Sequence, residues 1–348
     1  MIFASLPAYE SIANTSWTQK LRKRTIRELH KEGMKDEVMD GLMISFLHTI
    51  YQVLLPISLP VIGGALLKKF KRLDTKPLST LSLYVMSPAL IFETLLQAEV
   101  SGGEVLKTVI FCLLNVLLLW LVSEGAGRFL SMSQPERSGL NLVTMFTNSV
   151  NYGLPLVLLA FGQAGLDKAS VYVIVQIIII NTIGVFLAAK SHFSVKKALL
   201  SVFTLPSVYA ALLAVLLRLL QVSLPDALGT GVSLLSAAYA PLALVILGAQ
   251  MTGVSSGEDK PGVAKQAFVT GMLLRLLIAP FIAWGILAVL QADGLLFSVI
   301  MILSSMPAAV NAVILAEQYD AAPALVSKCI LWTTLASFAV LPVWLLAL

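Results

Sequence analysis

Long apolar blocks, most of them about 20 residues in length, follow one another along this chain from about residue 43 onward. A block of this length spans the hydrocarbon core of a bilayer as one α-helix. Because no water is present there to bind free backbone groups, a spanning segment must satisfy its own hydrogen bonds, as a helix does. Charged residues make up only 12% of the chain, about half of the fraction usual in soluble domains. The sequence therefore predicts an all-α integral membrane protein.

The apolar segments number ten, and the connections between them are short. Segment 204–220 is the weakest of them, because it is short and contains Arg218. Ten spans leave no room among these residues for a soluble catalytic or nucleotide-binding domain. We predict transmembrane helices at 43–67, 78–98, 105–123, 139–161, 169–189, 204–220, 228–250, 263–290, 295–316 and 323–348.

Lysine and arginine are distributed unevenly between the connections. The odd-numbered connections hold thirteen of them, whereas the even-numbered connections hold only two, Lys107 and Lys168. Cytoplasmic loops of membrane proteins carry such an excess of positive charge. This bias predicts that the odd connections face the cytoplasm and that both chain ends face outside. The loops also account for the net charge of +5, so no nucleic-acid partner is predicted.

The first 42 residues conflict with this orientation. Residues 20–35 hold seven lysines and arginines, which resist translocation, and they lack the apolar core of a secretory signal peptide. Two interpretations are open: either a basic amphipathic segment lies on the membrane surface, or the numbered chain starts upstream of the native start, at Met39 or Met43. We favour the second interpretation and treat residues 1–42 as an N-terminal extension.

Prolines recur at a nearly constant interval in the two halves of the chain. Pro88 and Pro241 are 153 positions apart, and Pro155 and Pro307 are 152 positions apart. Two five-helix halves would produce this interval, and because five is odd the second half enters the membrane in the opposite sense. A chance match of two prolines is the alternative. We predict two inverted repeats and a short cytoplasmic linker between them, at 43–190, 204–348 and 191–203.

The segments around Pro155 and Pro307 carry the polar residues expected of a binding site. Proline removes a backbone donor and clashes with the preceding turn, and asparagines in a bilayer are costly unless they face a cavity or each other. We predict that the helices at 139–161 and 295–316 are broken near the midplane, and that the N-terminus of a half-helix binds a carboxylate through its unpaired N–H groups. Two kinked packing helices are the alternative. The predicted substrate-binding residues are Asn148, Asn151, Gly153, Pro155, Pro307 and Asn311.

Two ionisable residues lie deep in apolar segments. Arg275 is twelve residues into segment 263–290, too deep to reach the membrane surface easily. It either binds an anionic substrate or acts as a structural counter-ion, and we retain it among the substrate-binding candidates. Glu93 follows Pro88 by five residues and is a candidate for coupling to a proton. Pairing with an arginine and a position near the outer surface are the alternatives for Glu93.

The string from Asn148 to Leu156, with Gly153, Leu154 and Pro155, resembles the crossover of the auxin efflux carrier family. That family includes plant auxin exporters and bacterial malonate and malate permeases. Residues 306–319, followed by Pro323 and a final apolar helix, are similar to the C-terminal part of the family.

Two further positions match this family: Arg275, with Pro280 five residues later, resembles its eighth helix, and Gln176 resembles a polar position in its fifth. The resemblance covers about residues 43–348 and implies ten helices in two inverted repeats, with scaffold and crossover sets and elevator-like transport of organic anions. It also implies that Asn148 is the substrate ligand of the crossover, and we take Gln176 as a second coupling candidate. The long hydrophilic loop of the plant exporters is absent, which argues against a hormone substrate.

These features predict a secondary transporter that moves a small mono- or dicarboxylate across the cell inner membrane. Coupling to H⁺ or Na⁺ and assembly as a homodimer are compatible with the pattern. The alternatives are a sodium-coupled carrier of the bile-acid-symporter type and a membrane sensor that transports nothing. Cys112 and Cys329 lie inside apolar segments, and no nucleophile–base pair or metal-ligand spacing is evident. We therefore predict no catalytic residues, metal or cofactor.

Overall fold

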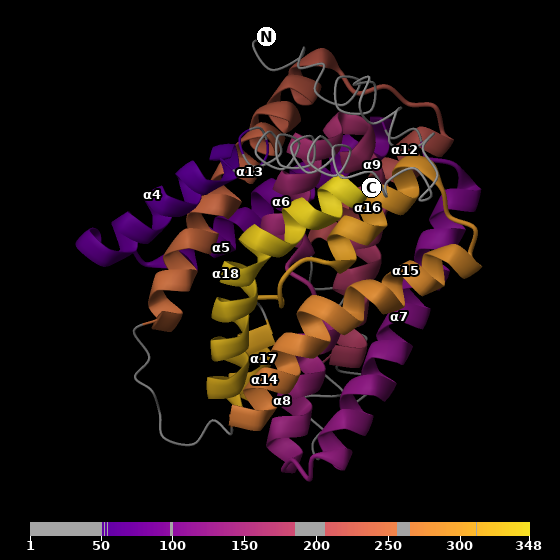
Figure 1. The fold of residues 1–348 in the computed structure, drawn as a ribbon. Coiled ribbons are helices and arrows are strands. Elements are labelled where there is room, and N and C mark those ends of the chain that lie inside the picture. The colour runs from indigo at the N-terminus through magenta and orange to yellow at the C-terminus, as the bar shows by residue number, and fades with distance from the viewer. Residues whose placement is uncertain are drawn as a thin grey trace, which may run out of the picture.

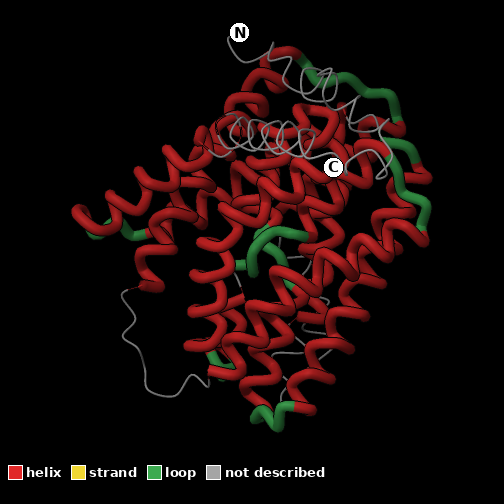
Figure 2. Tube along the Cα trace, viewed as in Figure 1, coloured by secondary structure: helices red, strands yellow, loops and turns green. Residues whose placement is uncertain are grey.

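Residues 51–348 are described by the computed structural model, except for residues 52, 54, 98–99, 185–205, 256–264 and 311. The described residues form helices joined by short connections, and their one extended pairing is an isolated antiparallel bridge between Thr147 and Ala308. Figures 1 and 2 show the helices packed side by side, with loop segments in the middle of the molecule. The predicted all-α class is confirmed for this part of the chain. The predicted extension 1–42 and linker 191–203 lie outside the described residues.

The first half of the described chain contains nine elements. Two of its helices, α7 and α8, begin at capping boxes. The backbone N–H of Ser101 donates to the Glu104 carboxylate, and that of Ser133 donates to the Glu136 carboxylate, each over 2.9 Å. Such boxes satisfy the first free N–H groups of a helix and define where it begins. The elements are α4 (Leu55–Lys71), α5 (Thr75–Leu81), η2 (Ser82–Met86), α6 (Ser87–Gln97), α7 (Gly102–Phe129), α8 (Gln134–Met145), η3 (Ser149–Gly153), α9 (Leu154–Ile179) and η4 (Ile180–Gly184).

The second half of the described chain runs from α12 to α18. Between α16 and α17 the helix is interrupted, and Figure 2 shows this interruption as a loop in the middle of the molecule. The elements are α12 (Pro206–Leu219), α13 (Asp226–Ser255), α14 (Lys265–Leu273), η5 (Leu274–Ile278), α15 (Ala279–Val289), α16 (Gly294–Ser304), α17 (Ala312–Gln318) and α18 (Pro323–Ala347).

Six helical stretches among the described residues are long and apolar enough to cross a membrane. α12, with 14 residues, and α16, with 11 residues, are apolar but shorter. The structure therefore supports a multi-pass helical membrane protein, although this criterion of length and composition counts fewer spans than the ten predicted. The six stretches are Thr75–Gln97, Gly102–Phe129, Ser149–Gly184, Asp226–Thr252, Lys265–Val289 and Pro323–Ala347.

The stretch Ser149–Gly184 is not one continuous helix. Gly162 lies inside it with φ of 66° and ψ of −162°, a backbone conformation that glycine adopts readily because it has no Cβ. The helix therefore breaks at Gly162, between the predicted segments 139–161 and 169–189. Just beyond the break, Lys168 forms an ion pair with Glu104 in the first turn of α7.

Three of the wide π turns end two residues before a proline. η2, η3 and η5 precede Pro88, Pro155 and Pro280 respectively. Proline has no N–H to donate, and its ring crowds the carbonyl of the preceding turn. An additional residue in that turn relieves the crowding and leaves the helix continuous. Each of these prolines therefore widens a helical turn and does not end the helix.

α4 and α13 approach each other closely at two glycines. A Cβ added to Gly64 would lie 1.9 Å from the carbonyl oxygen of Val245, and one added to Gly248 would lie 1.8 Å from the carbonyl oxygen of Val61. Small residues at an interface between membrane helices allow the two backbones to come together in this way. Figure 1 shows α4 and α13 crossing at one edge of the molecule.

Gly64→Ala is expected to destabilise the folded protein by about 1–3 kcal/mol, because the backbone of α13 must move to admit the methyl group. Gly63→Ala is the matched control, since no atom lies within 4 Å of the position that its Cβ would take. Thermal unfolding of both variants in detergent measures the difference. Equal unfolding midpoints for the two variants would show that α4 and α13 do not pack through Gly64.

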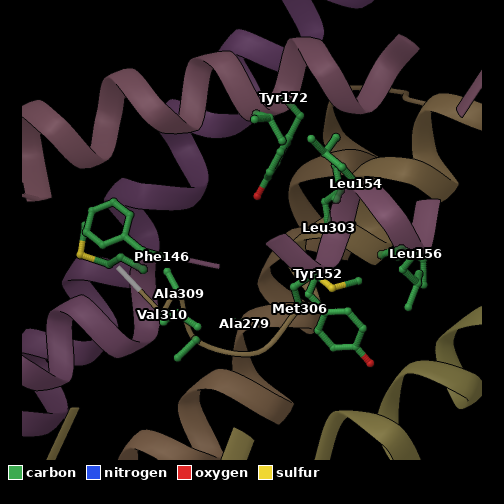
Figure 3. Packing of buried hydrophobic residues seen from close by; sticks show 14 of the residues in the cluster. Phe146, Tyr152, Leu154, Leu156, Tyr172, Ala279, Leu303, Met306, Ala309 and Val310 are labelled. Atoms are coloured by element: carbon green, nitrogen blue, oxygen red, sulfur yellow. The ribbon is translucent and has the colours of Figure 1, made fainter. Parts of the chain in front are cut away.

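Buried apolar side chains surround the middle of the bundle (Figure 3). Phe146, Ala309 and Val310 lie near one another, and Met306 lies beside Tyr152. These residues belong to the two interrupted regions of the chain, after α8 and after α16, and to the helical turn that follows the first interruption. The hydrophobic core therefore encloses both interruptions.

Candidate functional site

Two extended segments cross in the middle of the structure. The first, residues 146–148, follows α8, and the second, residues 307–309, follows α16 after a turn at residues 305–306. The backbone N–H of Asn148 donates to the Pro307 carbonyl, and the N–H of Ala309 donates to the Phe146 carbonyl, each over 2.9 Å. Each segment thus satisfies backbone groups of the other, as the interior of a bilayer requires.

The two prolines predicted to break these helices act differently. Pro307 lies within the second extended segment, where its missing N–H and its restriction of the preceding residue oppose a helix. Pro155 is the second residue of α9, which continues the wide turn η3 without a break in the helix. The first break is therefore at residues 146–148, ahead of Pro155, which only widens the turn η3.

Thr333 of α18 holds the second segment from the side. Its hydroxyl accepts a hydrogen bond from the N–H of Ala308 over 3.2 Å and donates to the carbonyl of Cys329 over 2.7 Å. Sequence reasoning did not identify Thr333, because a hydroxyl that bonds its own helix is unremarkable in an apolar segment. Only the position of Ala308 gives it a role.

A small cavity of about 50 Å³ lies against the first extended segment. Asn148 is only 4% exposed, and its side-chain Nδ2 has no hydrogen-bond partner among the described residues. The Asn148 carbonyl accepts from the N–H groups of Tyr152 and Gly153 over 3.2 and 3.0 Å, so η3 begins there. The amides between Asn148 and Tyr152 precede these first helical donors. The cavity is lined by Thr147, Asn148, Ser149, Val150, Asn151, Gln176, Ile177, Ile180, Ala309 and Val310, none of which is charged.

Gln176 of α9 binds both chain neighbours of Asn148. Its Nε2 donates to the Thr147 hydroxyl over 2.6 Å, and the Ser149 hydroxyl donates to its Oε1. Gln176 therefore holds the residues on both sides of Asn148, whose side-chain Nδ2 forms no hydrogen bond among the described residues. The structure places Gln176, a predicted coupling candidate, in the cavity wall. Thr147 and Ser149 were not predicted, and their only signal was adjacency to Asn148.

Arg275 lies at the start of η5, completely buried, and does not line the cavity. One guanidinium nitrogen donates to the Thr144 carbonyl over 2.7 Å, and another donates to the Ser304 carbonyl. Thr144 and Ser304 lie at the C-terminal ends of α8 and α16, where carbonyls lack helical donors and carry partial negative charge. One arginine thus caps both broken helices, and this geometry favours the structural interpretation of Arg275.

The other predicted binding residues are placed around the crossing. Asn151 lines the cavity, and the Pro307 carbonyl forms part of the pairing. Gly153 lies against the second broken helix, since a Cβ there would be 2.7 Å from the Leu303 side chain. Asn311 lies outside the described residues.

Glu93 is not part of this cavity. Its carboxylate accepts a hydrogen bond from the Ser233 hydroxyl, so that it joins α6 to α13. It is only partly buried. The structure therefore does not bring Glu93 together with Gln176, the other coupling candidate.

The apolar helices define a multi-pass membrane protein in which two broken helices cross. The chain belongs to the membrane transport protein family, which is the auxin efflux carrier family that its motifs resemble. The model of this family matches residues 46–198 and 189–345.

Two archaeal relatives support this assignment. An uncharacterized transporter of Methanothermobacter thermautotrophicus is 30% identical over 298 residues, which cover 84% of this chain and 96% of the relative. An uncharacterized transporter of Methanocaldococcus jannaschii is 25% identical over 309 residues, with the same coverage of 84% and 96%. The similarity therefore extends over nearly the whole length of both relatives.

Proposed function

We propose that this protein is a secondary transporter that moves a small organic anion, a mono- or dicarboxylate, across the cell inner membrane. The observation that carries the proposal is the unpaired carboxamide nitrogen of Asn148, buried at the start of a helix and facing a cavity at the crossing. A helix N-terminus bears about half a positive charge and binds carboxylates through its free N–H groups.

The rest of the cavity wall is consistent with a short organic acid. Donors are concentrated at the Asn148 end, and no acidic side chain lines the cavity to compete for them or to repel an anion. Ile177, Ile180 and Val310 supply apolar surface that suits a carbon skeleton.

We also propose the ten-helix arrangement with inverted repeats at 43–190 and 204–348. The break at Gly162 divides Ser149–Gly184, which a length criterion counts as one span. The interruptions after α8 and α16 leave helices too short to be counted as spans by that criterion. The crossing pairs the two breaks antiparallel, as two halves of opposite orientation would. In an elevator-like cycle, the crossed segments carry the anion against α4 and α13, whose close contact forms a rigid partner.

Contacts at the two ends of α7 support the proposed sidedness. Lys168 pairs with Glu104, and Lys107 donates to the Gln291 carbonyl over 2.7 Å, so three even-numbered connections meet at one end of α7. The opposite end of α7 carries Arg128, which belongs to the third connection. The excess of lysine and arginine in the odd connections then assigns the Arg128 end to the cytoplasm.

Purified protein in liposomes should take up short carboxylates, and other carboxylates should compete for that uptake. The neutral diamides of the same acids are the matched control, because they keep size and shape but lose the charge that the helix terminus binds. Uptake is measured with labelled solutes at equal concentrations. Transport of the diamides without the acids would contradict an anion site, and binding of acids without any uptake would identify a sensor.

A further inference from the structure

A second polar cavity lies next to the first one, among α5, η2, η3 and α13. Its volume is about 10 Å³, which is roughly the space that one water-sized particle occupies. Asn151 lines both cavities and so forms part of the wall of each. The second cavity is lined by Ser79, Ser82, Leu83, Asn151, Ile246 and Gln250.

Two oxygens at this cavity lack the partners that buried polar atoms normally have. Ser82 is 1% exposed, and its hydroxyl oxygen forms no hydrogen bond among the described residues. The side-chain Oε1 of Gln250 is also buried and unpaired. Leaving such atoms unsatisfied in a membrane interior is costly, so a bound species is expected to complete their coordination.

The wide turn η2 adds a backbone oxygen to this set. The N–H of Ser87 donates to the Ser82 carbonyl, which sets a five-residue spacing. The next donor in that spacing would be Pro88, which has no N–H, so the Leu83 carbonyl has no helical donor. Leu83 lines the cavity. Freed carbonyls at irregular helical turns are typical cation ligands in membrane transporters.

We propose that this cavity binds one Na⁺, held by the Ser82 hydroxyl, the Gln250 carboxamide oxygen and the Leu83 carbonyl, with Ser79 and Asn151 completing the shell. Every available ligand is a neutral oxygen, which suits a hard monovalent cation. The lining contains no carboxylate to neutralise a divalent ion and no group that could carry a transported proton. Its small volume favours Na⁺ over the larger K⁺.

The position of the cation next to the anion cavity gives it a role in transport. This role in transport rests on the proposed function, whereas the proposal that the cavity binds Na⁺ does not. A positive charge beside Asn151 attracts an anion in the neighbouring cavity, so each ligand increases the affinity for the other by the same factor. Bound Na⁺ would also connect α13 with the helix that begins at the first break.

The test is thermal unfolding of the full chain in detergent, titrated with NaCl against choline chloride at constant ionic strength. The unfolding midpoint should rise saturably with NaCl, by on the order of a few degrees, because Na⁺ binds only the folded state. KCl should produce little or no shift. Ser82→Ala and Gln250→Met each remove one ligand, and each should increase the half-saturating NaCl concentration by about tenfold or more.

Ser87→Ala is the matched control. Ser87 is also 1% exposed and its hydroxyl is also unpaired, but it does not line the cavity, so this variant should keep the Na⁺ response. The same midpoint in NaCl, KCl and choline chloride would mean that the cavity holds only water and would overturn the proposal. A Na⁺ response that survives both Ser82→Ala and Gln250→Met would also overturn it. Since no organic anion is present, a negative result leaves carboxylate uptake untouched.

Discussion

Arg275→Met is expected to lower the stability of the folded protein by about 3 kcal/mol or more. The substitution removes two charge-assisted hydrogen bonds, each worth about 1.5–3 kcal/mol, and leaves the carbonyls of Thr144 and Ser304 unpaired in the core. Both broken helices then lose the cation at their C-terminal ends. Thermal unfolding in detergent measures the loss, and Arg218→Met, at an exposed arginine of α12, is the matched control.

Arg275→Lys separates the two roles considered for this residue. Lysine keeps the charge but lacks the planar fork that reaches two carbonyls at once. If Arg275 is a structural cap, the Arg275→Lys protein should be less stable. Its carboxylate affinity, measured per folded molecule, should stay within a few-fold of that of the unmodified protein. A stable Arg275→Lys protein that has lost carboxylate binding would instead identify Arg275 as a direct ligand.

Asn148→Ala is expected to weaken carboxylate binding by about 10- to 150-fold. The change removes one hydrogen bond to an ionised group, worth about 1.5–3 kcal/mol. Stability should change little, because the Asn148 side-chain nitrogen bonds no described residue and the main-chain pairing with Pro307 is kept. Binding is measured by calorimetry, or from the concentration dependence of uptake into liposomes.

Asn115→Ala is the control for this experiment. Asn115 is a buried asparagine of α7 with an unpaired side-chain oxygen, but it lines neither cavity. Its substitution should therefore leave carboxylate affinity unchanged. Normal carboxylate uptake by Asn148→Ala would place the anion elsewhere in the protein.

Local sequence was sufficient for the family, the helical class and the existence of the two breaks. Apolar length predicts a spanning helix regardless of its neighbours, since lipid imposes this requirement on each segment separately. Asn148 and Pro307 are expensive in any membrane helix, so their presence marked the breaks without knowledge of the fold. The sequence did not locate the first break as clearly. Pro155 widens the turn η3, which lies after the break at residues 146–148, so the proline does not mark the break itself.

Sequence pattern could not distinguish lipid-facing from buried positions. In α7, Leu117 is 48% exposed and Leu119 is completely buried, yet both are leucine. A soluble helix would mark this difference with polar residues on its outer face, whereas a bilayer accepts the same apolar residues as the core does. The sequence also did not mark Gly64 and Gly248 as the positions where α4 and α13 meet, because a glycine in an apolar segment is found at both lipid-facing and buried positions.

The sequence alone thus determined the helical membrane class and the groups that are costly in a bilayer: the two interrupted helices and the buried polar residues Asn148, Gln176 and Arg275. Only the tertiary structure decided how those costs are met. Arg275 bonds a carbonyl 131 positions away at Thr144 and another 29 positions away at Ser304, and Gln176 binds both neighbours of Asn148. A charged or polar group in lipid must find partners, but which partners it finds depends on which helix ends meet, and contacts between distant segments create that geometry.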